Sequence, residues 1–313
     1  IIPYRNSKYY SQRPNISIKN SLKLNSEYGL NPMMKSLLPL WKENKLTFAL
    51  GIGWPNPNRS HFIAMDQWST GSESGEGKGW LAKISDSLKN EQYLLSLGTT
   101  GSNSVEGAKV NSLHLIGKEN YFYNNLNYRT EELISNRKSL QTFLEIDRYS
   151  TKKILEIKNK IKKLPSNINL PKGQLSKQTA IALQIINTDA PPTFIQMELS
   201  GFDTHQNQKN RQNKLLKELS ENIAFFKKTS EELNKNVDLN IVVTSEFGRR
   251  LKENGSKGTD HGSASIAFIV GDSFNEKFIG KYPDLTKLDN RGDLIPNINP
   301  RELYDYIQKK LWF

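Results

Sequence analysis

Apolar residues in this chain are grouped into short continuous runs that alternate with amphipathic stretches. The runs "LTFALGIG", "TFIQMELS", "LNIVVTSE" and "ASIAFIVG" are typical of buried strands. Helical spacing appears over 34–41, over about 206–233 and in the closing "PRELYDYIQKKL". This strand and helix alternation predicts an α/β fold with a central, mostly parallel sheet and helices on both faces.

A helical block separates the first strand-like run from the later ones. From 128 to about 188 the pattern is helical, in "TEELISNRKSLQTFLEI", "TKKILEIKNKIKKL" and "LSKQTAIALQIINT". Nearer the start, "NRSHFIAMDQWSTG" predicts a loop that passes into a short helix with Phe62, Met65 and Trp68 on one face. A length of 313 residues suits one large α/β domain or two ordinary ones, and no internal repeat is present. We interpret 1–313 as one domain with a helical insertion at about 128–188.

The composition is that of a globular chain with a positive charge. The sequence holds 44 Lys and Arg against 32 Asp and Glu, which gives a formal net charge of +12. Such a surface attracts nucleic acid, an anionic envelope polymer or small anions. The lysines are scattered among asparagines, without an arginine tract or an aromatic ladder, so nucleic-acid binding is not expected. A small anionic ester or an anionic polysaccharide fits the charge.

Several absences narrow the chemistry further. The chain has no cysteine, which excludes disulfides and thiol catalysis and leaves His, Asp, Glu and Asn as metal ligands. No run approaches the roughly 18 apolar residues of a membrane span. The P-loop, GxGxxG and GxSxG motifs are missing, which argues against a P-loop NTPase, a Rossmann dehydrogenase and an α/β-hydrolase.

Metal-ligating residue types follow the predicted strands. Asp203 and His205 come after "TFIQMELS", Glu246 follows "LNIVVTS", and Asp260 and His261 lie in the glycine-flanked "GTDHG". Open α/β sheets bind ligands at the carboxyl ends of their strands, so these side chains are expected on one edge. Five oxygen and imidazole donors from three segments predict a divalent metal site for Zn, Mn, Fe, Mg or Ca, depending on its geometry.

Each motif also has a simpler structural explanation. Asp203 or Thr204 could cap the helix that follows. Glu246 could pair with Arg249 or Arg250, and "GTDHG" could be a polar turn. The coincidence of all three motifs near predicted strand ends favours a shared site.

The stretch "NPNRSHF" places three reactive side chains at a predicted helix start. Arg59 could hold a phosphate or sulfate, or pair with a carboxylate. Ser60 could be a nucleophile or a helix cap, and His61 a ligand or an acid. Helix N-termini attract negative charge, which favours anion binding here.

With these residues assembled, the sequence resembles a bacterial family catalogued as domain of unknown function 1501. That family is itself similar to the alkaline phosphatase and sulfatase superfamily. The stretches that carry the resemblance run in the family's order across almost the whole chain. They are "GLNPMMKSLLPLW", "GIGWPNPNRSHFIAMDQWSTG", "GWL" at 79–81, "GFDTHQNQ" and "VVTSEFGRRLKENGSKGTDHG".

The resemblance implies an alkaline phosphatase-like fold, with a central sheet flanked by helices. It also implies a one- or two-metal centre that activates a hydroxyl nucleophile against a phosphate or sulfate ester. Asp203 and His205 resemble the superfamily's first Asp and His ligands, and His261 resembles its later histidine ligand. Asp260 either joins His261 on the metal or orients the His261 imidazole. Ser60 stands near the place of the superfamily nucleophile.

Two departures from the family pattern bear on the site. Glu246 stands where an aspartate is usual, and Phe247 replaces the adjacent histidine, which implies that a second metal is held weakly or differently. The family normally opens with an "RGGxDG"-like segment whose aspartate resembles a further ligand, and this chain begins just after it. The chain starts at Ile1 without a methionine, a basic segment or an apolar leader, so a signal segment is absent or already removed.

The leading hypothesis is a metal-dependent hydrolase of an anionic ester, phosphate rather than sulfate, that is periplasmic or secreted. Arg59 and Arg249 would neutralise the ester oxygens, and the positive net charge would attract the substrate. The alternative is a non-catalytic envelope or glycan-binding protein that retains the hydrolase fold.

Overall fold

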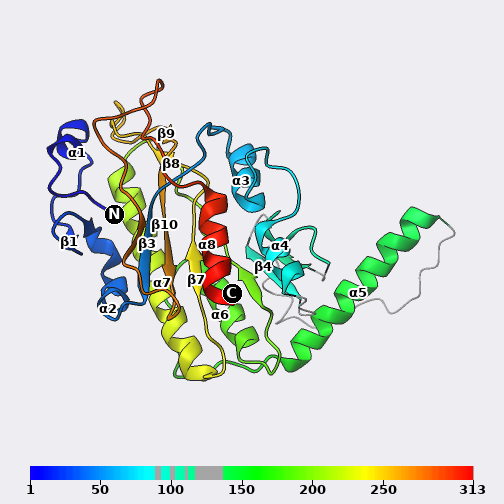
Figure 1. Ribbon diagram of the computed structural model, residues 1–313. Helices are drawn as coiled ribbons and strands as arrows, with labels where there is room; N and C mark the ends of the chain where they lie inside the picture. Colours follow the sequence, from blue (N-terminus) through cyan, green and yellow to red (C-terminus); the bar gives the residue numbers. More distant parts are fainter. Residues whose placement is uncertain (89–92, 99–102, 110–111, 117–136, 313) are drawn as a thin grey trace.

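The computed structural model describes all residues except 89–92, 99–102, 110–111, 117–136 and 313 (Figure 1). Its helices are α1 (Ser7–Gln12), the 3-10 helix η1 (Pro32–Leu37), α2 (Leu38–Lys42), α3 (His61–Thr70), α4 (Trp80–Ser87), the 3-10 helix η2 (Asn103–Val105), α5 (Lys138–Lys160), α6 (Leu175–Ile186), α7 (Gln208–Leu233) and α8 (Pro300–Trp312). Its strands are β1 (Leu22–Lys23), β2 (Gly29–Leu30), β3 (Leu46–Ile52), β4 (Leu94–Gly98), β5 (Ser112–Ile116), β6 (Phe194–Gln196), β7 (Ile241–Val243), β8 (Gly248–Arg249), β9 (His261–Gly262), β10 (Ser265–Val270) and β11 (Phe278–Gly280).

The described strands form several sheets. The larger sheet has the order β11-β3-β10-β7, in which β10 runs antiparallel to β3 and β7 while β11 runs parallel to β3. A second sheet, β5-β4-β6, is parallel. The fold is therefore mixed α/β, and the predicted single, mostly parallel central sheet is not confirmed. Residues 244–264, which join β7 to β10, contain no helix, so the chain returns antiparallel without a crossover.

The larger sheet is covered by α7 and α8, which lie on either side of it in Figure 1. Successive strand residues point to opposite faces. Accordingly, Phe48 and Leu50 of β3 pack with Ile223 of α7, whereas Ala49 packs with Leu303 of α8. All seven residues of β3 are buried, which explains why its sequence is apolar apart from Thr47.

The parallel sheet packs against the helical block. Leu95 and Leu97 of β4 share a core with Ile181 and Ile185 of α6. The first predicted residues of the helical insertion, 128–136, lie outside the described residues, and the rest contains α5 and α6. Helix α5 projects from the body of the molecule (Figure 1). The two segments "SLQTFLEI" and "TKKILEI" belong to this one helix.

The longest described helices are α7, with 26 residues, and α5, with 23. Both carry many charged side chains. Across the described ranges, no helix combines the length and the apolar character that crossing a bilayer requires.

Helix α3 buries a different face from the predicted one. Phe62 is 82% exposed and Met65 is 41% exposed, whereas Trp68 is buried. The buried face is formed by Ala64, Gln67 and Trp68. Residues three or four positions apart share a helix face. Phe62 and Trp68 are two steps of three apart, which is less than two full turns, so their side chains point to different faces.

Candidate metal centre

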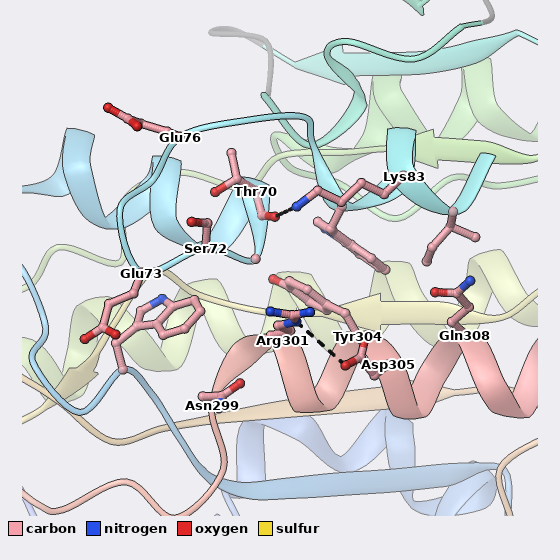
Figure 2. Close-up of a pocket in the computed structure, with 14 residues that line it drawn as sticks. Thr70, Ser72, Glu73, Glu76, Lys83, Asn299, Arg301, Tyr304, Asp305 and Gln308 are labelled. Carbon is pink, nitrogen blue, oxygen red and sulfur yellow. Dashed lines mark hydrogen bonds and ion pairs between the residues drawn. The ribbon is translucent and has the colours of Figure 1, made fainter. Parts of the chain in front are cut away.

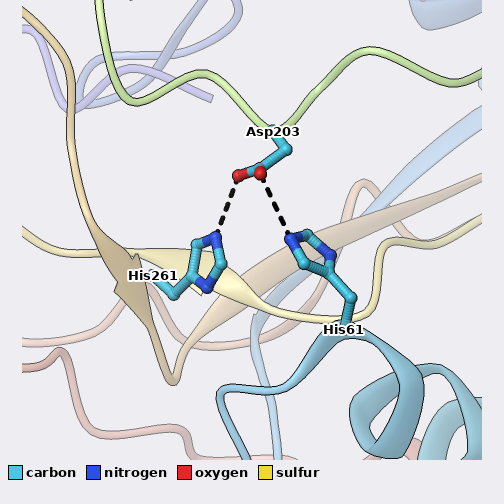
Figure 3. A group of neighbouring side chains, drawn as sticks. All are labelled: His61, Asp203 and His261. Atoms are coloured by element: carbon cyan, nitrogen blue, oxygen red, sulfur yellow. Dashed lines mark hydrogen bonds and ion pairs between the residues drawn. The ribbon is translucent and has the colours of Figure 1, made fainter.

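Asp203 lies at the centre of a cluster of imidazole rings (Figure 3). Its carboxylate oxygen Oδ1 is 2.8 Å from His205 Nε2 and 2.9 Å from His261 Nε2. Its other oxygen, Oδ2, is 3.3 Å from His61 Nε2. Three separate segments meet here, because Asp203 and His205 lie in the loop before α7, His61 is the first residue of α3, and His261 begins β9.

The donor atoms of Asp203, His205 and His261 form a compact triangle. The two histidine Nε2 atoms are 2.9 Å apart, close to the distances from each to Asp203 Oδ1. Zinc bonds of about 2.0–2.1 Å place tetrahedral ligand atoms roughly 3.3 Å apart. The triangle is slightly tighter than that, and its carboxylate and imidazole donors suit Zn, Mn or Fe. Ligand atoms of His61, Asp203 and His261 also lie within 4.8 Å of one another. The residues therefore fit a divalent ion.

The charge of Asp203 is set by its neighbours. Burial raises the pKa of Asp203, but the hydrogen bond from His261 and the charges of His205, His61 and His261 outweigh it. The net result is that the pKa of Asp203 lies well below its usual range. Asp203 is accordingly ionised at neutral pH, as a metal ligand must be.

The other two predicted ligands lie outside this triangle. Glu246 Oε1 is 2.9 Å from His61 Nδ1, on the side of the ring that faces away from Asp203. Asp260 Oδ1 is 3.6 Å from His205 Nδ1. The sequence predicts Asp260 either as a ligand beside His261 or as an outer partner of the His261 imidazole, but the structure has it beside His205. Both carboxylates face the Nδ1 atom of an imidazole whose Nε2 atom faces Asp203, which is where an outer partner would orient a metal-bound histidine. Only Glu246 is within hydrogen-bonding distance of its imidazole.

Arg249 is bonded to the protein itself. Its guanidinium donates to the carbonyl oxygens of Thr259 and Phe202, both at 2.8 Å, and to Asp203 Oδ1 at 3.2 Å. The backbone of Arg249 also pairs with His261 across the β8 and β9 ladder. Arg249 thus joins three segments of the site, and its guanidinium is not directed at open solvent.

Arg59 and Ser60 precede α3. Ser60 is the exposed N-cap residue of α3, and its side chain makes no capping hydrogen bond. Arg59 Nη2 lies 2.5 Å from Asp293 Oδ2, so this guanidinium pairs with a carboxylate. Neither Asp203 nor Thr204 caps α7, whose N-cap is Asn207.

Asp293 is a supporting residue that sequence reasoning did not identify. It is fully buried and binds two arginines, Arg59 and Arg250, the latter through Nε at 2.9 Å. Arg59 lies two residues before His61, and the backbone N–H of Arg250 donates to the Asp260 carbonyl. Asp293 therefore ties together the segments that carry His61 and His261. Its sequence signal, an acidic residue in "NRGDL", is too common in turns to indicate this role.

Phe247 forms the apolar wall of the site. It is 8% exposed, and its ring centroid lies 4.0 Å from that of His261 and 4.9 Å from that of His61. Phe247 thus packs against two of the clustered imidazoles and limits their movement.

Gly258 allows the "GTDHG" loop to approach His205 closely. A Cβ atom at position 258 would lie 2.1 Å from the His205 carbonyl oxygen, which is backbone and cannot turn aside. Asn254 fixes the same approach, since its amide donates to the His205 carbonyl at 2.9 Å and accepts from the Gly258 N–H at 3.0 Å.

We expect Gly258→Ala to weaken divalent-metal binding by about tenfold or more, because the loop must move away from His205. Calorimetric titration with Zn²⁺ and Mn²⁺ measures this. Gly255→Ala, in the same loop, is the matched control, since a Cβ there meets no atom within 4 Å. Equal affinities of the two variants would contradict the expected dependence on close approach.

Comparison with known proteins identifies a family but no individual relative. No curated protein and no solved structure matches the chain. A family model, described as "Protein of unknown function (DUF1501)", matches residues 50–285, which include every residue of the cluster. The chain belongs to this family.

Proposed function

We propose that this protein is a metal-dependent hydrolase of an anionic ester, with phosphate favoured over sulfate. The observation that carries the proposal is the convergence of Asp203, His205 and His261, whose donor atoms lie 2.8–2.9 Å apart. The resemblance of these motifs to the alkaline phosphatase and sulfatase superfamily supports the reaction class. A bound divalent ion would polarise the ester and lower the pKa of a hydroxyl or water.

Ser60 and His61 are proposed to carry the chemistry beside the metal ligands. Ser60 is exposed at the start of α3, where helix amides favour a negatively charged group. Its hydroxyl is the proposed nucleophile. His61 is held between Glu246 and Asp203, at 2.9 Å and 3.3 Å, so its ring is oriented to transfer a proton.

Binding of the ester is proposed to depend on the metal and the α3 N-terminus more than on arginine. Arg59 is paired with Asp293, and Arg249 donates to two carbonyl groups and Asp203. The net charge of +12 would still raise the local concentration of an anionic substrate.

Hydrolysis of aryl phosphates and aryl sulfates tests the proposal. The protein loaded with Zn²⁺ or Mn²⁺ is expected to release the phenol from the phosphate, and a chelator should abolish this release. Ser60→Ala should lower kcat by at least about 100-fold, since it removes the nucleophile. Hydrolysis that persists in the chelator would contradict the proposal.

One observation favours the alternative, a non-catalytic glycan-binding or envelope protein. Both predicted ester-binding arginines, Arg59 and Arg249, already have partners within the protein. Stoichiometric metal binding with no turnover of either ester would support this alternative and exclude the hydrolase.

A further inference from the structure

A pocket of about 540 Å³ lies beside Thr70 (Figure 2). Thr70 is the last residue of α3, whose first residue is His61. The loop 71–76, helix α4 and helix α8 enclose it. Helix α3 has 10 residues and rises about 1.5 Å per residue, so the pocket is roughly 14 Å from His61. Its volume lies in the range of small-molecule sites, about 300–1,000 Å³. None of the residues of the metal centre lines it.

Aromatic side chains form a rigid wall of this pocket. The rings of Trp80 and Tyr304 are stacked, with centroids 4.1 Å apart and an interplanar angle of 7°. The Tyr304 hydroxyl donates to the Trp68 carbonyl at 2.8 Å, which fixes the stack. Trp54 also lines the pocket, and its buried Nε1 has no hydrogen-bond acceptor among the described residues. Buried donors are normally paired, so a ligand hydroxyl or a water would satisfy this indole N–H.

Two cations approach the pocket from opposite sides. Lys83 comes from α4 and Arg301 from α8 (Figure 2). Lys83 Nζ donates to the Thr70 carbonyl at 2.7 Å, and among the described residues no carboxylate lies within 4.0 Å of it. Within the described part of the chain, the only carboxylate within 4.0 Å of the Arg301 guanidinium is that of Asp305, at 4.0 Å. Burial and the charge of Arg301 lower the pKa of Lys83, and the charge of Asp305 offsets this only in part. A single anionic group bound between these cations would relieve their repulsion.

Three carboxylates also line the pocket and limit which anions fit. They belong to Glu73, Glu76 and Asp305. Carboxylates repel a polyphosphate, but they accept hydrogen bonds from hydroxyl groups. A ligand with several hydroxyls, one negative group and an apolar ring face matches all three parts of the lining.

We infer that this pocket binds an acidic sugar, a monosaccharide unit that carries one carboxylate, sulfate or phosphate. The anionic group lies between Lys83 and Arg301, and the hydroxyls face the carboxylates and Trp54 Nε1. The inference is independent of the metal centre. It gives the protein a second, non-catalytic site for an anionic glycan.

Calorimetry and tryptophan fluorescence test this with four probes. They are a galacturonate tetrasaccharide, a sulfated heparin tetrasaccharide, glucose 6-phosphate and neutral maltotetraose. At least one acidic probe is expected to bind at least about tenfold more tightly than maltotetraose, because charge-assisted hydrogen bonds are the stronger ones. The acidic probe that binds most tightly identifies the anionic group. Arg301→Ala and Lys83→Ala should each weaken this binding by about tenfold or more.

Two controls separate this pocket from other sources of binding. Lys309→Ala removes an exposed cation of α8 outside the pocket and should change the affinity by less than about twofold. His261→Ala should leave the affinity unchanged, so failure of the metal centre and failure of this site are distinguishable. The inference is overturned if no acidic probe binds, or if Lys309→Ala weakens binding as much as Arg301→Ala. It is also overturned if inorganic sulfate or AMP binds as tightly as the sugars with the same dependence on Arg301.

Discussion

Asp203→Asn is expected to weaken divalent-metal binding by more than about 100-fold, beyond the 10–100-fold effect typical of outer partners. The reason is the position of Asp203, whose two oxygens contact His205, His261 and His61 within 3.3 Å. Asparagine keeps the shape of the side chain but removes the negative charge that a divalent ion requires. Calorimetric titration with Zn²⁺ and Mn²⁺ measures the loss, and hydrolysis should fall in parallel.

Asp260→Asn is the matched control for this prediction. Asp260 lies 3.6 Å from His205 Nδ1 and outside the triangle of donors. Its substitution should therefore weaken metal binding by only about tenfold. If Asp260→Asn weakens binding as much as Asp203→Asn, the assignment of Asp203 as the central ligand is wrong.

Asp293→Ala is expected to lower the free energy of unfolding by about 2–3 kcal/mol, somewhat less than the roughly 3–5 kcal/mol cost of breaking a fully buried ion pair. Asp293 is fully buried, whereas the side chains of Arg59 and Arg250 are 37% and 29% exposed. The substitution leaves both guanidinium groups without their carboxylate, and their partial exposure moderates the cost. Urea unfolding followed by tryptophan fluorescence measures the change.

The control for this stability prediction is Asp305→Ala. Asp305 is 69% exposed and lies 4.0 Å from Arg301, so its removal should change the stability by less than about 0.5 kcal/mol. Asp293→Asn, which retains hydrogen-bond acceptors, should fall between the two. Equal stabilities of Asp293→Ala and Asp305→Ala would show that Asp293 does not hold the two segments together.

The sequence predicts the elements of this fold better than their arrangement. Strands β3 and β10 are recognisable because both are short, buried, apolar runs, and α7 is recognisable from its helical periodicity. Strand direction is a different matter, since a buried strand has the same apolar pattern in a parallel and in an antiparallel sheet. Strand β10 runs antiparallel to β7 because the connection 244–264 contains no crossover helix. Elsewhere in the sequence strands and helices alternate, which favours a parallel sheet and hides this exception.

For the candidate site, too, the sequence identifies the residues better than it predicts their arrangement. Residue type and position after a predicted strand are enough to select Asp203 and His205, and the glycine-flanked "GTDHG" loop adds His261. The structure brings these three residues together. Residue type and position do not distinguish ligands from outer partners, because Glu246 and Asp260 are carboxylates like Asp203. The difference is the imidazole nitrogen that each faces: Asp203 faces Nε2 atoms, whereas Glu246 and Asp260 face Nδ1 atoms. Asp293 cannot be selected in this way, because its role depends on the tertiary packing that brings it to Arg59 and Arg250.

Metal content is the most direct test of the central claim. After incubation with Zn²⁺ or Mn²⁺ and removal of free ions by gel filtration, inductively coupled plasma mass spectrometry should find bound metal in a constant ratio to protein. The His205→Ala/His261→Ala double variant, which removes two of the three clustered donors, should retain essentially none. A wild-type protein that retains no metal, or a double variant that retains as much as the wild type, would contradict the metal centre.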